Sequence, residues 1–283
     1  MKKIILVNIS GFGDLYLALP TLKRIKKDFP KSKLTFVCTK GFGIFANPFV
    51  DEIIEIDSPN FLRPVEKNKD SLKKNINFLK NVLKLTFRKF DLMIEFRRAK
   101  RTIILDKFIH AKNKIDFAQI KKWEKEEKLP KINDIYVRDE AAKIYSLATG
   151  KKQRFDFLNF KKNPENYIVL SPFSAIHNKD ISVEKINDIL KNISKPVYLV
   201  GIKRDLQTAS KIIEKKNVIN LIGKTDLKKL EDLILNSKKT ICCDSFALHI
   251  AAMNRVPIEL YINDRVFCPK RYQPKYNVSI KKL

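Results

Sequence analysis

Several common functional signals are missing from this chain of 283 residues. Its four cysteines, Cys38, Cys242, Cys243 and Cys268, form no C-x-x-C pair and have no partner histidines at zinc spacing. We therefore expect reduced cysteines in the core, a cytoplasmic setting and no metal site.

Long apolar runs are also absent. The apolar run at residues 4–7 breaks at Asn8, and no signal-peptide cleavage site follows it. No stretch approaches the roughly 20 apolar residues that span a bilayer. We expect neither a leader peptide nor a transmembrane segment.

Acidic residues are scarce, with 31 Asp and Glu against 58 Lys and Arg and a formal net charge of +27. Such an excess favours a polyanionic partner, namely nucleic acid, anionic lipid or a phosphorylated substrate. The alternative is a solvated basic surface, because the lysines are scattered through segments such as residues 72–89 and form no single arm.

Short β-branched runs alternate with helical periodicity along the chain, which predicts parallel sheets. The length suits two domains of about 100–150 residues each. A polar linker at 151–166 separates the two halves, and we place the domains at residues 1–160 and 161–283. Strands are expected at 3–10, 34–39, 53–56, 91–95, 114–117, 167–170, 197–200, 218–221, 240–243 and 258–262. Helices are expected at 15–28, 72–89, 139–149, 183–191, 205–215, 227–237 and 247–253.

Two acidic residues follow predicted strands, each at the mouth of a helix, in opposite halves of the chain. Asp14 lies in the segment ISGFGDL and Asp244 in ICCDSFALH. In open parallel sheets, ligands bind beyond the carboxyl ends of the strands, where helix N-termini offer free N–H groups. The two junctions predict two nucleotide-style domains that face a cleft.

The residues around these junctions resemble the bacterial lipopolysaccharide heptosyltransferases, glycosyltransferase family 9. In the first half the resemblance rests on residues 11–15 (GFGDL), 19–24 (LPTLKR), 29–30 (FP) and 90–95 (FDLMIE). In the second half it rests on residues 169–172 (VLSP), Lys179, 199–201 (LVG), 220–227 (NLIGKTDL), 244–245 (DS) and 249–252 (HIAA). These segments follow the family's order along most of the chain.

The resemblance implies an α/β protein with the GT-B fold, in which two Rossmann-like domains face a cleft. Residues 1–160 would bind the acceptor and residues 161–283 the nucleotide sugar. The implied activity is inverting, metal-independent transfer of a heptose or related sugar, with no cofactor beyond the donor. The implied donor is a nucleotide-diphosphate sugar such as ADP-heptose, and the acceptor a lipopolysaccharide or lipooligosaccharide core. With an anionic, lipid-linked acceptor, we expect a cytoplasmic enzyme in peripheral contact with the inner membrane.

Direct displacement needs a base for the acceptor hydroxyl and positive groups for the departing diphosphate. Asp14 is the candidate base, with Gly13 beside it on the acceptor side; the alternative is an ordinary helix N-cap. Lys179 is the candidate cation, with Ser174 as a hydrogen-bond donor; the alternative is a solvated lysine. The family often has an aromatic residue soon after this lysine, but this sequence has Asp180 and Ile181 there.

The second junction supplies the other donor contacts. Backbone N–H groups at Asp244, Ser245 and Phe246 would face the diphosphate, and Asp244 would bond hydroxyls of the sugar. The family has glycine where Phe246 stands, and glycine allows close backbone approach or positive φ. His249, one helical turn on, is either a donor contact or a structural histidine.

Two further turns are assigned to the donor. Lys224 and Thr225 lie in a strand-to-helix turn that is no P-loop, because the first glycine of that motif would fall at Val218. Asp205 would hold a ribose hydroxyl or merely cap a helix.

A basic cluster follows the strand predicted at 91–95. It consists of Arg97, Arg98, Lys100 and Arg101, and we assign the three arginines to an acceptor that carries phosphate or carboxylate. The alternative is a solvated helix face.

Two functions of other classes stay open. The first is a basic nucleic-acid-binding protein, although no recognisable binding motif is present and we expect no nucleic-acid partner. The second is a catalytically inactive relative that serves as an interaction module, for which Phe246 and the short chain are the supporting features.

Overall fold

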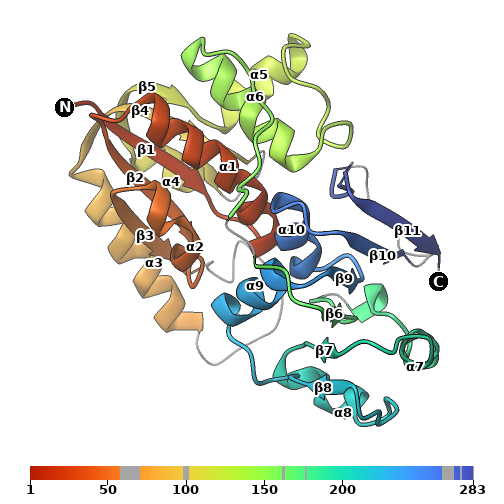
Figure 1. Cartoon of the computed structure of the whole chain (residues 1–283). Coiled ribbons are helices and arrows are strands. Elements are labelled where there is room, and N and C mark those ends of the chain that lie inside the picture. Colours follow the sequence, from red (N-terminus) through yellow and green to blue (C-terminus); the bar gives the residue numbers. More distant parts are fainter. Residues whose placement is uncertain are drawn as a thin grey trace. The chain divides into compact units, whose positions relative to one another are not determined.

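The computed structural model describes residues 1–57, 71–97, 102–160, 163–175, 177–262, 271–274 and 276–282. The chain divides into two compact units, Met1–Asp156 and Phe157–Leu283, which are drawn in Figure 1. The division expected from the sequence, after residue 160, falls just beyond this one.

The first unit is built on a five-stranded parallel sheet with the strand order β3-β2-β1-β4-β5. Its strands are β1 (Lys3–Asn8), β2 (Lys33–Thr39), β3 (Glu52–Ile56), β4 (Lys89–Glu95) and β5 (His110–Ile115). Its α-helices are α1 (Phe12–Asp28), α2 (Gly43–Ala46), α3 (Ser71–Thr86), α4 (Ile103–Phe108), α5 (Phe117–Lys125) and α6 (Val137–Thr149), with a 3-10 turn η1 (Asn47–Phe49) after α2.

Helices cover both faces of this sheet. Ile5 and Val7 of β1 pack in one apolar cluster with Phe78 of α3 and Leu105 of α4. Neighbouring side chains of a strand point to opposite faces, so the fully buried Leu6 lies on the other face. There α1 and α6 pack against each other (Figure 1).

The second unit is a six-stranded parallel sheet with the order β11-β10-β9-β6-β7-β8. Its strands are β6 (Ile168–Ser171), β7 (Val197–Leu199), β8 (Val218–Asn220), β9 (Lys239–Cys242), β10 (Ile258–Ile262) and β11 (Val278–Lys282). Its helices are α7 (Val183–Lys191), α8 (Leu206–Ala209), α9 (Leu227–Asn236) and α10 (Phe246–Met253), with 3-10 turns η4 (His177–Lys179) and η5 (Lys203–Asp205).

Both sheets have a Rossmann-like strand order. In each unit the first strand lies between the second and the fourth: β1 between β2 and β4, and β6 between β7 and β9. The order in which strands are added reverses at this point, and in open parallel sheets ligands bind beside such a switch point. The switch points are therefore β1/β4 in the first unit and β6/β9 in the second.

Most expected elements form, and α7 and β10 have the expected bounds. The helix expected at 205–215 is wrong beyond Ala209, where α8 ends. The N–H of Ile213 donates to the side chain of Asn187 at 2.9 Å, so a tertiary hydrogen bond replaces a helical one. β5 ends at Ile115 because Asp116 caps α5, accepting from the N–H of Gln119 at 2.9 Å. The sequence missed α2, α4, α5 and β11.

Three cysteines, Cys38, Cys242 and Cys243, are buried thiols, as expected. Burial raises the pKa of Cys38 and of Cys243 to about 12. Cys268 lies outside the described residues. None of the helices in the described part of the chain combines the length and apolar character that crossing a bilayer requires.

Two carboxyl groups are buried in the first unit, one at the last residue of β4 and one in α4. Glu95 is fully buried, Asp106 of α4 is 6% exposed, and the hydroxyl of Thr102 donates to Glu95 Oε1. Burial raises the pKa of Glu95 well above its usual range and raises that of Asp106 to about 6. Among the described residues, no N–H or O–H group donates to Glu95 Oε2 or Asp106 Oδ1. Two ionised carboxylates cannot hydrogen-bond to each other, so a bond between these two groups requires that one of them be protonated.

This pair predicts a stability that falls as pH rises. The unfolded chain releases these protons near pH ~4, whereas burial in the folded chain raises the pKa of Asp106 to about 6 and that of Glu95 well above its usual range. Glu95→Gln keeps an amide that accepts from Thr102 and donates to Asp106, and it removes one of the two charges. At pH 8 the variant should exceed the wild type by roughly 1–3 kcal/mol in free energy of unfolding, with a smaller gain at pH 5.

Urea denaturation at pH 5 and pH 8 measures this difference. The exposed Glu214→Gln is the matched control and should show no such pH dependence. Parallel pH profiles for wild type and Glu95→Gln would contradict the shared-proton interpretation.

Candidate functional site

The first switch point holds an ion pair that joins two neighbouring strands. Val7 of β1 pairs in register with Glu95 of β4, and the N–H of Phe96 continues the ladder to the carbonyl of Val7 at 3.0 Å. Arg97 follows directly and donates from Nη1 to Oδ2 of Asp14. Side-chain exposure is 15% for Arg97 and 9% for Asp14. The pair thus crosses the switch point at the carboxyl ends of β1 and β4.

The alternative that Asp14 caps α1 is wrong. The N-cap is Gly11, and Asp14 lies inside the first turn, where the helix dipole favours an acidic side chain. The turn before it is held by Ser10, whose hydroxyl donates to Asn8 Oδ1 at 2.7 Å and whose carbonyl accepts from the Thr39 hydroxyl at 2.8 Å. Asp14 therefore stands on a fixed turn.

Arg97 is placed beside the candidate base rather than on a solvated helix face. Gly13, also expected on the acceptor side, is the second residue of α1. Arg98 and Arg101, with Lys100, lie outside the described residues. Their roles as acceptor contacts stay predictions.

The second switch point holds a matching ion pair. Lys179 Nζ lies 2.5 Å from Oδ2 of Asp244, which follows β9. The hydroxyl of Ser174, in the loop after β6, donates to the Asp244 carbonyl at 3.1 Å. Side-chain exposure is 20% for Lys179 and 10% for Asp244. Three of the expected donor residues are therefore brought together where β6 and β9 end.

Residues that sequence reasoning did not assign to the site hold its loop in place. The N–H of Ser174 donates to Asp180 Oδ1 at 2.6 Å, and Arg204 donates to the Ser174 carbonyl. The N–H of Ile181 donates to the Pro172 carbonyl at 2.9 Å. Ile181 is 1% exposed and belongs to the core cluster of this unit. No local signal marks Arg204, because it acts on a loop residue 30 positions away that only the fold brings near.

The N-terminus of α10 carries buried polar atoms that have no partner in the described part of the chain. Ser245 is its N-cap, with an extended backbone at φ −140° and no side-chain cap bond. Among the described residues, neither Ser245 Oγ nor His249 Nδ1 has a hydrogen-bond partner. Burial lowers the pKa of His249 to about 4, so the imidazole is neutral at neutral pH. Buried polar groups are normally satisfied, so these atoms suit a polar ligand.

Phe246, which stands where the family has glycine, is the first residue of α10 and is partly buried. It is not among the non-glycine residues with positive φ. The backbone at this point therefore imposes no conformation that requires glycine.

The remaining expected donor residues lie after β7 and β8. Asp205 is buried, and its Oδ2 accepts from the N–H of Ile202 at 2.8 Å, which is the capping role. Lys224 is exposed and donates to the Asn220 carbonyl at 3.3 Å, and Thr225 follows it, partly buried. Arg204 links this side to the Ser174 loop, since its Nε lies 3.5 Å from Asp205 Oδ1.

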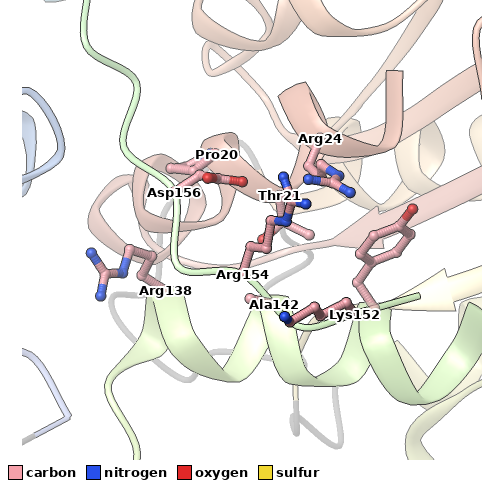
Figure 2. Close-up of a pocket in the computed structure, with 9 residues that line it drawn as sticks. Pro20, Thr21, Arg24, Arg138, Ala142, Lys152, Arg154 and Asp156 are labelled. Atoms are coloured by element: carbon pink, nitrogen blue, oxygen red, sulfur yellow. The ribbon is translucent and has the colours of Figure 1, made fainter. Parts of the chain in front are cut away.

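A separate basic cavity lies between α1, α6 and the residues that follow α6 (Figure 2). Its volume is about 10 Å³, which is room for about one water molecule. Arg24 pairs with Asp28 at 2.7 Å, and the Tyr145 hydroxyl donates to Asp28 at 2.8 Å. The cavity is too small for a sugar, and the polar side chains around it hold α1 and α6 together within the first unit. Its lining consists of Pro20, Thr21, Arg24, Arg138, Ala142, Tyr145, Lys152, Arg154 and Asp156.

Comparisons with known proteins agree with this arrangement. The chain is 24% identical over 286 aligned residues to the lipopolysaccharide core heptosyltransferase OpsX of Haemophilus influenzae, covering 91% of this chain and 78% of that protein. The structure of E. coli heptosyltransferase WaaC with ADP matches with a TM-score of 0.77 at 15% identity, covering 99% of this chain and 93% of that one. A glycosyl transferase family 9 structure from Veillonella parvula matches with a TM-score of 0.75 at 17% identity, covering 100% of this chain and 86% of that one.

The fold is thus the expected GT-B fold of these glycosyltransferases, and the nucleic-acid-binding alternative is not favoured. The model of glycosyltransferase family 9 (heptosyltransferase) matches residues 130–281, which is more than half of the 283 residues. The chain therefore belongs to glycosyltransferase family 9, the heptosyltransferase family, and is a glycosyltransferase.

Proposed function

We propose that the protein transfers a heptose or related sugar from a nucleotide-diphosphate sugar to a lipopolysaccharide or lipooligosaccharide core. The relatives support this, since one is named a lipopolysaccharide core heptosyltransferase and another was solved with ADP. ADP-heptose is the proposed donor. The observation that carries the proposal is the pairing of a carboxylate with a cation at each switch point, Asp14 with Arg97 and Lys179 with Asp244.

Asp14 is the proposed base. Its carboxylate has about four lone-pair positions, so the bond from Arg97 leaves room to accept the proton of an acceptor hydroxyl. The hydroxyl oxygen then forms a bond to the anomeric carbon while the bond from that carbon to the diphosphate oxygen breaks. Attack opposite the leaving group inverts the anomeric centre, and the nucleoside diphosphate departs.

The second unit is the proposed donor side. Lys179 has three N–H donors, and its bond to Asp244 leaves two for phosphate oxygens. The first turn of α10 adds backbone N–H groups, and Ser245 Oγ and His249 Nδ1 add polar atoms that lack a described partner. These groups supply the charge stabilisation that transfer needs, so no metal or other cofactor enters the proposal.

The first unit is the proposed acceptor side, with Gly13, Arg97, Arg98 and Arg101 facing an anionic, lipid-linked oligosaccharide. Because such an acceptor is membrane-bound, we place the enzyme in the cytoplasm with peripheral contact to the anionic inner membrane. The net charge of +27 supports this contact, since each nearby Lys or Arg adds ~1 kcal/mol of attraction to such a surface.

Asp14→Asn tests the base. The amide cannot take the hydroxyl proton, so turnover should fall by roughly 100- to 10,000-fold. Donor binding belongs to the second unit and should stay within about twofold. Sugar transfer from ADP-heptose to core acceptor measures the first quantity and calorimetry with ADP the second, with the exposed Asp134→Asn as control. Near-normal turnover in Asp14→Asn would remove Asp14 as the base, whereas ADP binding without transfer in the wild type would identify the inactive relative.

Lys179→Ala tests the donor site. A ligand at 100 times its dissociation constant stabilises its protein by about 2.7 kcal/mol, so a thermal-shift panel of nucleotides and nucleotide sugars should single out one base. Lys179→Ala should lose most of that shift because it removes the cation facing the diphosphate. The exposed Lys211→Ala should keep the shift. An unchanged shift in Lys179→Ala would exclude the lysine as a diphosphate contact.

A further inference from the structure

Helix α3 carries apolar side chains on its outer side as well as towards the core. Phe78, Val82 and Leu85 are buried in the core cluster of the first unit. The outer side has Ile76, Leu79 and Leu83 at 45%, 58% and 57% exposure, and Phe87, directly after the helix, at 85%. We call Ile76, Leu79, Leu83 and Phe87 the α3 outer face.

The spacing places these side chains in one strip. Positions 76, 79 and 83 differ by three or four residues, so they follow one side of the helix, and Phe87 comes four residues later, just past the end of the helix. At 1.5 Å per residue the strip is about 16 Å long. Single exposed apolar side chains are ordinary, but a continuous strip on a surface helix marks an interaction site.

Basic residues border this strip. Lys80 and Lys84 are exposed, and each follows a residue of the strip in sequence, which places both along one edge of it. Neither is ion-paired among the described residues. Residues 71–90 contain no Asp or Glu, so nothing on α3 offsets these charges. An apolar strip edged with lysine matches a surface that has anionic groups above an apolar layer.

We propose that the α3 outer face docks on an anionic lipid bilayer, with its four apolar side chains in the boundary between headgroups and acyl chains. Lys80 and Lys84 then face the lipid phosphates. An amphipathic helix of this kind lies in the plane of the interface, held by buried apolar area and by attraction to anionic lipid. A purely apolar protein partner would gain nothing from the lysine edge.

The position of α3 in the first unit gives the contact a use. β4 follows α3 in sequence and ends beside Arg97 and Asp14. Docking through α3 would therefore hold the unit that carries the candidate base at the surface where a lipid-linked acceptor lies. This use rests on the proposed function, but the docking itself does not.

Vesicle co-sedimentation tests the proposal. The wild type should bind vesicles of phosphatidylglycerol and phosphatidylcholine much more strongly than vesicles of phosphatidylcholine alone. The triple variant Leu79→Ser, Leu83→Ser, Phe87→Ser should lose at least tenfold in affinity for the anionic vesicles. Its matched control is Leu206→Ser, Ile219→Ser, Ile280→Ser, which changes three exposed apolar residues of the second unit and should bind normally.

Two double variants distinguish the effect of Lys80 and Lys84 from the effect of the net charge of the protein. Lys80→Glu with Lys84→Glu should weaken binding several-fold more than Lys211→Glu with Lys216→Glu, although both variants change the net charge equally. Equal losses in the two variants, or no vesicle binding by the wild type, would overturn the proposal.

Insertion is read out independently by fluorescence. Phe87→Trp should be quenched by brominated lipid, whereas Trp123, which is 8% exposed, supplies the unquenched background in the wild type. Circular dichroism confirms that each variant is folded. If size-exclusion chromatography shows a dimer that the Leu79, Leu83 and Phe87 substitutions dissociate, the strip is a self-association surface and the bilayer proposal fails.

Sugar transfer to a delipidated core acceptor separates this proposal from the proposed function. The triple variant should transfer to the delipidated acceptor at the wild-type rate. Vesicle binding through α3 with no transfer from any donor would remove the transferase assignment and leave the docking surface standing. Transfer without vesicle binding would do the reverse.

Discussion

The candidate site depends on one constraint, the reversal of strand order in each sheet. At that point the loops from two neighbouring strands leave in opposite directions and leave the strand ends open to a ligand. Asp14 follows β1 and Arg97 follows β4, whereas Lys179 follows β6 and Asp244 follows β9. Each ion pair therefore crosses a switch point, and each brings one carboxylate and one cation to the place where a parallel sheet offers helix N–H groups.

Both ion pairs are largely buried, so each contributes to the stability of its unit. Removing one partner of a buried pair leaves an uncompensated charge, at a cost of about 3–5 kcal/mol when burial is complete. The first unit also contains two buried carboxyl groups, those of Glu95 and Asp106. Burial raises the pKa of Glu95 and Asp106, so a proton shared between them removes one negative charge from this part of the core.

In the second unit, buried polar atoms without a described partner lie at the candidate site. Arg204 and Asp180 fix the Ser174 loop through its backbone, which frees the Ser174 hydroxyl to reach Asp244. Ser245 Oγ and His249 Nδ1 remain without a described partner at the start of α10. A fixed loop beside unsatisfied polar atoms is the arrangement expected where a ligand completes the hydrogen bonding.

The sequence by itself determined the alternation of strands and helices and the turns that carry Asp14 and Asp244, because periodicity and turn chemistry are local properties. Resemblance to a family added Lys179. Only the tertiary structure decided that Arg97 pairs with Asp14 across 83 positions and Lys179 with Asp244 across 65. It also decided that α8 ends at Ala209, because Ile213 donates to Asn187 and does not continue the helix. A strand's pattern specifies that it is buried but not which strand becomes its neighbour, and the two ion pairs follow from strand order.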